Sequence, residues 1–236
     1  MTKKDILDKL KGNLIVSCQV YPDDPMYTPD MALEFAKAAD WGGCAGFRAN
    51  SPEQIAMIKE AFPDKPIIGI WKKWIDGVDV YITPTIEDAK AIWDAGAQII
   101  AMDGTFHTRE DGRPAWQMIE EVKREIPEAI IFADIATIEE ARNAVAHGAD
   151  IVAPTLQGYT RETEGQAGPD FALLKELKEE LGDKAWVIME GHINTPDLAV
   201  EALENGADAV VVGSAITRPH FVTKWFADAM KEAEKK

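Results

Sequence analysis

A lysine and a glutamate each stand at the end of an apolar run, where a folded chain can present them to a ligand. Lys72 follows the run 66–71, and Glu190 closes the run 186–190. A lysine acts as a base near neutral pH only if its pKa falls from about 10.4 to about 7–8, which burial and a cationic neighbour both favour. Desolvation raises the pKa of a carboxyl group and suits it to donate a proton. The two residues therefore predict an acid/base pair, with Lys72 as the base.

Other interpretations of Lys72 stay open at this point. Lys73 follows it and is a candidate cationic neighbour, although side chains alternate along a strand and Lys73 could face away. Two adjacent lysines also occur on solvated surfaces. A lysine at a strand end can instead attack a carbonyl group, as in a Schiff-base aldolase, with Glu190 helping to dehydrate the adduct. Borohydride trapping of a substrate adduct would distinguish an aldolase from a proton-transfer enzyme.

The stretches after the last two apolar runs are suited to bind a phosphate. They read Glu190-Gly191-His192-Ile193-Asn194 and Gly213-Ser214-Ala215-Ile216-Thr217-Arg218. Each contains a glycine, which lets the backbone approach a ligand closely. The second can form a short helix ended by Pro219, whose first amides would face an anion while Arg218 pairs with it. A phosphorylated small molecule is therefore the predicted ligand.

The elements that position these residues are indicated by a repeated unit. Gly96-Ala97-Gln98, Gly148-Ala149-Asp150 and Gly206-Ala207-Asp208 each separate a helical stretch from an apolar run. A glycine suits the left-handed cap that ends a helix, and an apolar run without strict alternation is typical of a buried parallel strand. The repetition predicts an α/β chain that forms a single (β/α)₈ TIM barrel domain over residues 1–236. Such a barrel keeps its chemistry at the carboxyl ends of its strands, and often binds phosphate after strands seven and eight.

Eight strands and several helix starts can be placed on the chain. The predicted strands cover residues 14–19, 46–49, 66–71, 99–103, 129–134, 151–155, 186–190 and 209–213. A Ser or Thr before proline predicts helix starts at Thr28, Ser51 and Thr195, and a capping box predicts one at Thr137. The segment 79–85 is interpreted as a loop, because counting it as a strand would make nine.

The predicted strand ends collect an unusually polar set of side chains in one mouth. The set consists of Gln19, Arg48, Lys72, Asp103, Asp134, Thr155 and Glu190. Asp103 and Asp134 could equally well cap a helix or bind a loop. Arg48 could be the ion-pair partner of one of them.

Composition narrows the classes of partner. A net charge of −16 argues against nucleic acid and anionic membranes, which require clustered Lys and Arg. The charged first residues do not resemble a signal peptide, and no apolar run reaches the roughly 18 residues of a membrane span.

Cys18 and Cys44 are expected to be buried thiols in a cytoplasmic protein. The four histidines show no metal-ligand spacing, so neither a metal nor another cofactor is expected. The sequence does not determine the oligomeric state, and we consider a homodimer as the candidate assembly.

Motifs along nearly the whole chain resemble the N-acetylmannosamine-6-phosphate 2-epimerase family. The matching segments are 12–19, 46–51, 133–137, 155–160, 190–196 and 212–219. The resemblance implies an isomerase that interconverts N-acetylmannosamine 6-phosphate and N-acetylglucosamine 6-phosphate in amino-sugar and sialic acid catabolism. It also implies roles for particular residues: catalytic for Lys72 and Glu190, sugar-binding for Gln19, Arg48 and Asp134, and phosphate-binding for Gly191, Gly213, Ser214 and Arg218.

Three departures from the family pattern bear on substrate preference and on the pKa of the lysine. Lys73-Trp74-Ile75 stands where the family usually has Arg-Asp-Tyr, and Gly213-Ser214 replaces the usual Gly-Gly. His192 stands where the family commonly has arginine, so its contact with the substrate is expected to be weaker or pH-dependent. A barrel that binds a sugar phosphate but has lost turnover through the changes after Lys72 is the remaining alternative.

Overall fold

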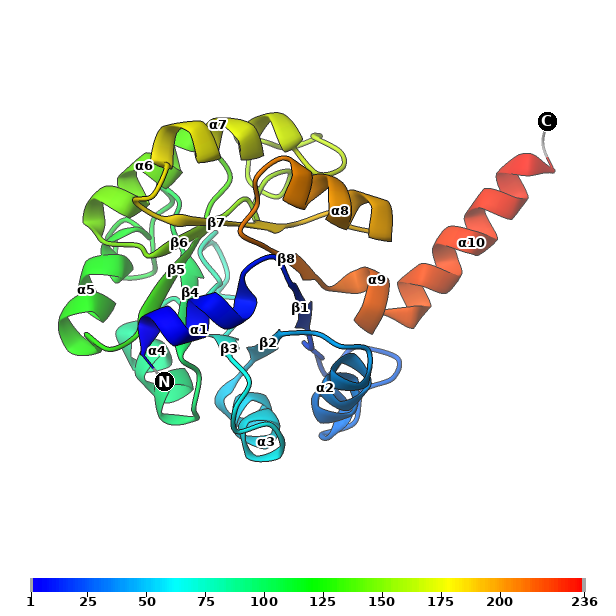
Figure 1. Ribbon diagram of the computed structural model, residues 1–236, viewed down its shortest axis with the longest axis horizontal. Coiled ribbons are helices and arrows are strands. Elements are labelled where there is room, and N and C mark those ends of the chain that lie inside the picture. The colour runs from blue at the N-terminus through cyan, green and yellow to red at the C-terminus, as the bar shows by residue number, and fades with distance from the viewer. Residues whose placement is uncertain (1, 235–236) are drawn as a thin grey trace.

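The strands form a closed barrel of eight parallel strands in chain order (Figure 1). The computed structural model describes residues 2–234, so the predicted domain of residues 1–236 is seen over that range, with positions 1, 235 and 236 outside it. The strands are β1 (Leu14–Ser17), β2 (Gly46–Asn50), β3 (Ile67–Ile70), β4 (Ile99–Asp103), β5 (Ile130–Asp134), β6 (Ile151–Ala153), β7 (Trp186–Glu190) and β8 (Ala209–Val212). The predicted TIM barrel is therefore confirmed, with some strands one or two residues shorter than expected.

Helices alternate with the strands and surround the barrel (Figure 1). They are α1 (Lys3–Leu10), α2 (Met31–Trp41), α3 (Pro52–Ala61), α4 (Ile86–Asp94), α5 (Gln117–Glu125), α6 (Ile138–His147), α7 (Phe171–Leu181), α8 (Pro196–Glu204), α9 (Ser214–Thr217) and α10 (Pro219–Ala233). The capping box at Thr137 and the left-handed glycine after α6, Gly148 with φ 110°, are present as predicted. Each fixes a helix end by local backbone hydrogen bonds.

One predicted helix start is wrong. Thr28 does not begin α2, which starts at Met31 with Asp30 before it. The segment instead forms successive turns, in which the Tyr27 N–H donates to the Asp24 carbonyl at 2.9 Å and the Met31 N–H to the Thr28 carbonyl at 3.1 Å. The Thr-Pro signal is shared by turns and helix starts, and here the turn prevails.

Two apolar layers hold the barrel together. The inner layer fills the barrel with side chains such as Ile68, Phe132 and Ile188, and α1 adds Ile6 and Leu10 to it. The outer layer packs the other faces of the strands against the surrounding helices. Each strand contributes side chains to both layers, because successive side chains point to opposite faces. The filled interior forms a packed base beneath the side chains at the carboxyl ends of the strands.

The segment 79–85 is a loop, as predicted, and it borders the end of β3. Lys72 and Ile82 form an isolated antiparallel bridge, and the Lys73 N–H donates to the Tyr81 carbonyl at 2.9 Å. These contacts bring Tyr81 beside Lys72.

The last helix stands apart from the barrel. In Figure 1, α10 points away from the molecule beyond α9, while α2 and α8 flank the place where it leaves. None of the residues 219–233 is buried. No helix within residues 2–234 has the length and apolar character needed to cross a membrane.

Candidate active site

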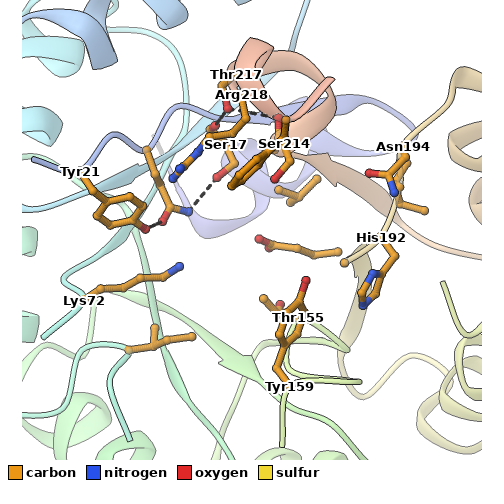
Figure 2. Close-up of a pocket in the computed structure, with 18 of the residues that line it drawn as sticks. Ser17, Tyr21, Lys72, Thr155, Tyr159, His192, Asn194, Ser214, Thr217 and Arg218 are labelled. Carbon is orange, nitrogen blue, oxygen red and sulfur yellow. Dashed lines mark hydrogen bonds between the residues drawn. The ribbon is translucent and has the colours of Figure 1, made fainter. Parts of the chain in front are cut away.

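A cavity of about 650 Å³ opens at the carboxyl ends of the strands (Figure 2). Its wall comes from the ends of β1, β3, β7 and β8 and the segments that follow them, from the loop after β6, and from the first turns of α10. The predicted site residues that line it are Gln19, Lys72, Glu190, Gly191, His192, Gly213, Ser214 and Arg218. The structure therefore brings together residues almost 200 positions apart in sequence, at the edge of the barrel where such folds carry out their chemistry.

Lys72 extends into this cavity from the end of β3. Its backbone N–H donates to Asn50 Oδ1 at 2.8 Å, and its Nζ lies 5.7 Å from the ring centroids of both Tyr21 and Tyr81. Burial and, to a smaller extent, the nearby Arg48 guanidinium lower the pKa of Lys72, carboxylates oppose the shift, and the resulting pKa is about 8. A substantial fraction of the amine is thus neutral near physiological pH, as a general base requires.

Lys73 faces away from Lys72, as strand alternation allows. It forms an ion pair with the buried Asp88, and its Nζ lies 3.8 Å from the centroid of the Trp71 ring. The cations that act on Lys72 are therefore Arg48, from a neighbouring strand, and more weakly Arg218, and not the residue at the adjacent position.

Arg48 connects the two carboxylates beneath the cavity. Its Nη1 and Nη2 donate to the two carboxylate oxygens of Asp134 at 3.0 and 2.7 Å, and Nη1 also pairs with Glu190. Arg48 and Asp134 are 1% and 0% exposed and do not line the cavity. Both residues lie in a buried ion-pair network, and the expectation that Arg48 and Asp134 hold the sugar stays a prediction. The sequence did not show whether Arg48 pairs with Asp103 or with Asp134, and in the structure its partner is Asp134.

Glu190 lies where this ion-pair network reaches the cavity. Burial raises the pKa of its carboxyl group, and the Arg48 guanidinium counteracts the rise. Burial and the arginine thus act on this carboxyl group in opposite directions, and its place in the cavity wall makes it a candidate proton donor.

The opposite end of the cavity is built from β8, α9 and β1. The Thr217 hydroxyl donates to the Ser17 carbonyl at 2.9 Å and fixes α9 against β1. Arg218 lines the cavity while its Nη1 donates to Asp24 at 2.5 Å. Within the described residues, the N–H groups of Ser214 and Ala215 have no acceptor, so both remain available to an anion.

Some lining residues were missed by the sequence reasoning. They are Ser17, Tyr21, Tyr81, Tyr159, Phe221 and Trp225. Tyr21 lies two positions beyond Gln19 and donates its hydroxyl to Gln19 Oε1 at 2.5 Å, so its nearness to a strand end could have marked it. Tyr81 and Tyr159 come from loops, and Tyr159 stacks on His192 with ring centroids 5.3 Å apart. Loop residues carry no periodic signal that would point to a site.

The sequence of residues 31–232 matches the family model described as putative N-acetylmannosamine-6-phosphate epimerase. The chain belongs to this family. It is 41% identical to the putative N-acetylmannosamine-6-phosphate 2-epimerase of Caldanaerobacter subterraneus subsp. tengcongensis, over 97% of this chain and 95% of that protein. It is 43% identical to the bifunctional enzyme NanE/NanK of Brucella melitensis, over 98% of this chain and 43% of that protein.

A solved structure of an epimerase also matches this fold. The N-acetylmannosamine-6-phosphate 2-epimerase from Clostridium perfringens superposes with a TM-score of 0.88 at 39% identity, covering 94% of this chain and 95% of that one. Membership of the epimerase family agrees with the resemblance recognised in the sequence motifs. It also fits a cavity that combines a partly neutral lysine, a carboxyl group and free backbone amides.

Proposed function

We propose that this chain interconverts N-acetylmannosamine 6-phosphate and N-acetylglucosamine 6-phosphate, with Lys72 as the base at C2 and Glu190 as its proton-transfer partner. The observation that carries the proposal is the lowered pKa of Lys72, about 8, in a cavity that it shares with Glu190. The substrate is thus a small sugar phosphate. Family membership and the cavity geometry both support an isomerase acting on a carbohydrate derivative.

The chemistry begins with the open form of the sugar. In the closed ring the C2 hydrogen is not acidic, so the ring must open to an aldehyde at C1. The neutral Lys72 amine then takes the C2 proton and becomes an ammonium, while the C–H electrons form an enolate. Return of a proton to the opposite face inverts C2. Since C2 carries an acetamido group and no hydroxyl, the enolate does not collapse to a ketose.

Glu190 supplies either the proton for ring opening or the one for the opposite face of C2. When it donates, its carboxylate is left beside Arg48, which is already positioned to stabilise the negative charge. Asp134 holds the Arg48 guanidinium in place through two hydrogen bonds. We therefore assign Arg48 and Asp134 as positioning residues for Glu190.

The phosphate binds at the end formed by β7, β8 and α9. The Ser214 amide and the backbone at Gly191 and Gly213 approach it, and Arg218 adds positive charge. Gly191 has a φ of 108°, a conformation that a side chain would strain, so the loop can turn close to the ligand. Gln19 and His192 line the space between the phosphate and C2 and are proposed to contact the sugar.

The proposal is tested by running the reaction in deuterated water and observing C2 by proton NMR. Epimerised product with deuterium at C2 is expected. An epimerised product without label would favour shielded return of the proton by a single base. Inactivation by borohydride in the presence of substrate would instead indicate a Schiff base on Lys72, and binding without conversion would indicate a non-catalytic barrel.

A homodimer is proposed from the exposed face of α10. Phe226 and Met230 are each 70% exposed, and Val200 on α8 is 54% exposed. A barrel normally covers its last strand with its last helix, whereas here α10 leaves the place between α8 and α2 open (Figure 1). The α10 helix of a second copy would cover apolar surface there. Sedimentation is expected to show a dimer, and the Phe226→Glu, Met230→Glu double variant a monomer.

A cytoplasmic location is also proposed. Cys18 and Cys44 are both free and buried, which fits a reducing compartment.

A further inference from the structure

A second, smaller cavity lies next to the main one. Its volume is about 100 Å³, and Asp103, Leu156, His107, Tyr81 and Tyr159 contribute to its wall. The two tyrosines also line the main cavity, so the two spaces meet at these rings. Nothing in the proposed reaction so far uses the smaller space.

The smaller cavity lies on the side of Lys72 that faces away from the phosphate end. Figure 2 shows Ser214 and Arg218 at one end of the pocket, with Lys72 and Tyr159 toward the other. The Tyr81 ring, which both cavities share, is centred 5.7 Å from Lys72 Nζ. The acyl substituent on C2 reaches about 4 Å from that carbon, because three bonds separate C2 from the end of an acetyl group. With C2 at Lys72 and the phosphate near Ser214, the acyl group can extend to the tyrosines.

Asp103 gives this cavity a polar atom without a partner. The residue is 2% exposed, and its Oδ1 accepts hydrogen bonds from the Thr105 backbone N–H at 2.9 Å and from the Thr105 hydroxyl at 2.6 Å. Among the described residues, no donor reaches Oδ2. Oδ2 is not among the fully enclosed polar atoms that lack a partner, so it faces the cavity, where a ligand hydroxyl can donate to it.

The charge state of Asp103 fits an acceptor. Burial raises its pKa to about 6, so the group is mainly a carboxylate at pH 7.5. His107, which also lines the cavity, is held through Nε2 by Glu162 at 3.1 Å. Leu156, 3% exposed, provides an apolar wall. A short acyl chain ending in a hydroxyl matches this combination of an apolar wall and one acceptor.

We propose that the smaller cavity receives the N-acyl group and that Asp103 Oδ2 accepts a hydrogen bond from a hydroxyl on that group, so that the enzyme also epimerises N-glycolyl amino-sugar 6-phosphates. The inference rests on the proposed function, since it requires C2 to lie at Lys72. The reaction at C2 is unchanged: the same C–H bond breaks and forms again, and the glycolyl group is neither oxidised nor transferred.

The test compares three mannosamine 6-phosphates that carry N-acetyl, N-glycolyl or N-propanoyl groups. Propanoyl has the size of glycolyl, with a methyl group in place of the hydroxyl. We expect kcat/KM for the glycolyl compound to be within about threefold of the acetyl compound and at least tenfold above the propanoyl compound, because a hydrogen bond to a charged group is worth about 1.5–3 kcal/mol.

Asp103→Asn removes the charge at nearly constant volume and should reduce the glycolyl-to-propanoyl ratio to within about threefold. Asp79→Asn is the matched control, because Asp79 lines the same cavity but is paired with Arg161 at 2.7 Å, and there the ratio should stay high. Leu156→Phe fills the cavity and should lower kcat/KM for both larger acyl groups relative to acetyl.

The outcomes distinguish a failure of the N-acyl inference from a failure of the epimerase proposal. If the wild-type enzyme converts the acetyl compound but treats glycolyl no better than propanoyl, the acyl inference is overturned and the epimerase proposal stands. An unchanged ratio in Asp103→Asn also overturns the inference, since the hydroxyl would then be bound elsewhere. If none of the three compounds is epimerised, both proposals are wrong.

Discussion

Polar side chains end the strands all around the barrel mouth, yet the two sides of the mouth use them differently. On the side of β1, β7 and β8, Gln19, Glu190 and Ser214 line the main cavity. On the side of β2 and β5, Arg48 and Asp134 are 1% and 0% exposed and bind each other beneath it. The first side is available to a ligand, whereas the second is closed to it.

Lys72 belongs to both sides. It extends from β3 into the cavity, but the Arg48 guanidinium, from the closed side, helps to lower its pKa. Glu190 stands on the open side and pairs with the same arginine. In the proposed mechanism, the open side contacts the substrate, while the closed side influences the protonation of Lys72 and Glu190, the two groups assigned to proton transfer. Each prediction below tests one side of this division.

The largest effect is expected from removing the base. Lys72→Ala should lower kcat by about 10²–10⁴-fold, the usual contribution of a positioned general base, without loss of the folded state. Lys73→Met is the matched control, since Lys73 is paired with Asp88 on the other face of the chain. It should lower stability, because Asp88 is buried, but kcat of the folded enzyme should stay within about threefold of wild type. Turnover by proton NMR and the circular dichroism spectrum are the two measurements. Full activity in Lys72→Ala would remove the lysine from the mechanism.

The closed side is tested by breaking its ion pair. Arg48→Met should destabilise the protein by about 3–5 kcal/mol, because it leaves Asp134 and Glu190 buried without their partner. Arg142 provides a surface comparison: it pairs with Glu180 at 2.6 Å but is 46% exposed, so Arg142→Met should leave the urea midpoint almost unchanged. Urea unfolding measures both. Equal losses in the two variants would show that burial adds nothing to the Arg48 pair.

The difference between local and distant signals explains how much of this molecule could be predicted. The barrel was predictable because helix caps such as Gly148 and apolar runs such as β4 act within a few residues. The pairing of Arg48 with Asp134 spans 86 positions, and that with Glu190 spans 142, so only the folded barrel brings these charges together. Asp103 remained ambiguous for the same reason, since its burial depends on the whole mouth.

Local signals also failed where tertiary contacts override them. Thr28-Pro29 carries a helix-start signal, but the segment before it turns so that Asp24 meets Arg218, 194 positions away. No local sequence pattern indicates that α10 extends away from the barrel either. A terminal helix has the same kind of sequence pattern whether it packs on its own barrel or extends from it.

A smaller effect is expected in the pH dependence of the reaction. Lys72 must be neutral to accept the C2 proton, so kcat/KM should rise with pH and level off above about pH 8. Glu190 raises the pKa of Lys72, and its replacement in Glu190→Gln should move this limb to lower pH in whatever activity remains. Initial rates across pH 6–9.5 measure the shift. A limb that stays in place or moves upward would contradict the coupling of the two groups.

The smallest effect concerns His192, on the open side. Its ring lines the cavity and stacks on Tyr159, and its position carries an arginine in the family pattern. A guanidinium always carries a positive charge and presents several N–H donors to an anionic substrate, so His192→Arg should lower KM by about fivefold with kcat unchanged. Because the site is partly open to water, added salt should reduce this gain. A change in kcat with KM constant would instead place His192, like Glu190 before it, among the groups that act on C2, and the residues at the end of β7 would then not divide between proton transfer and binding.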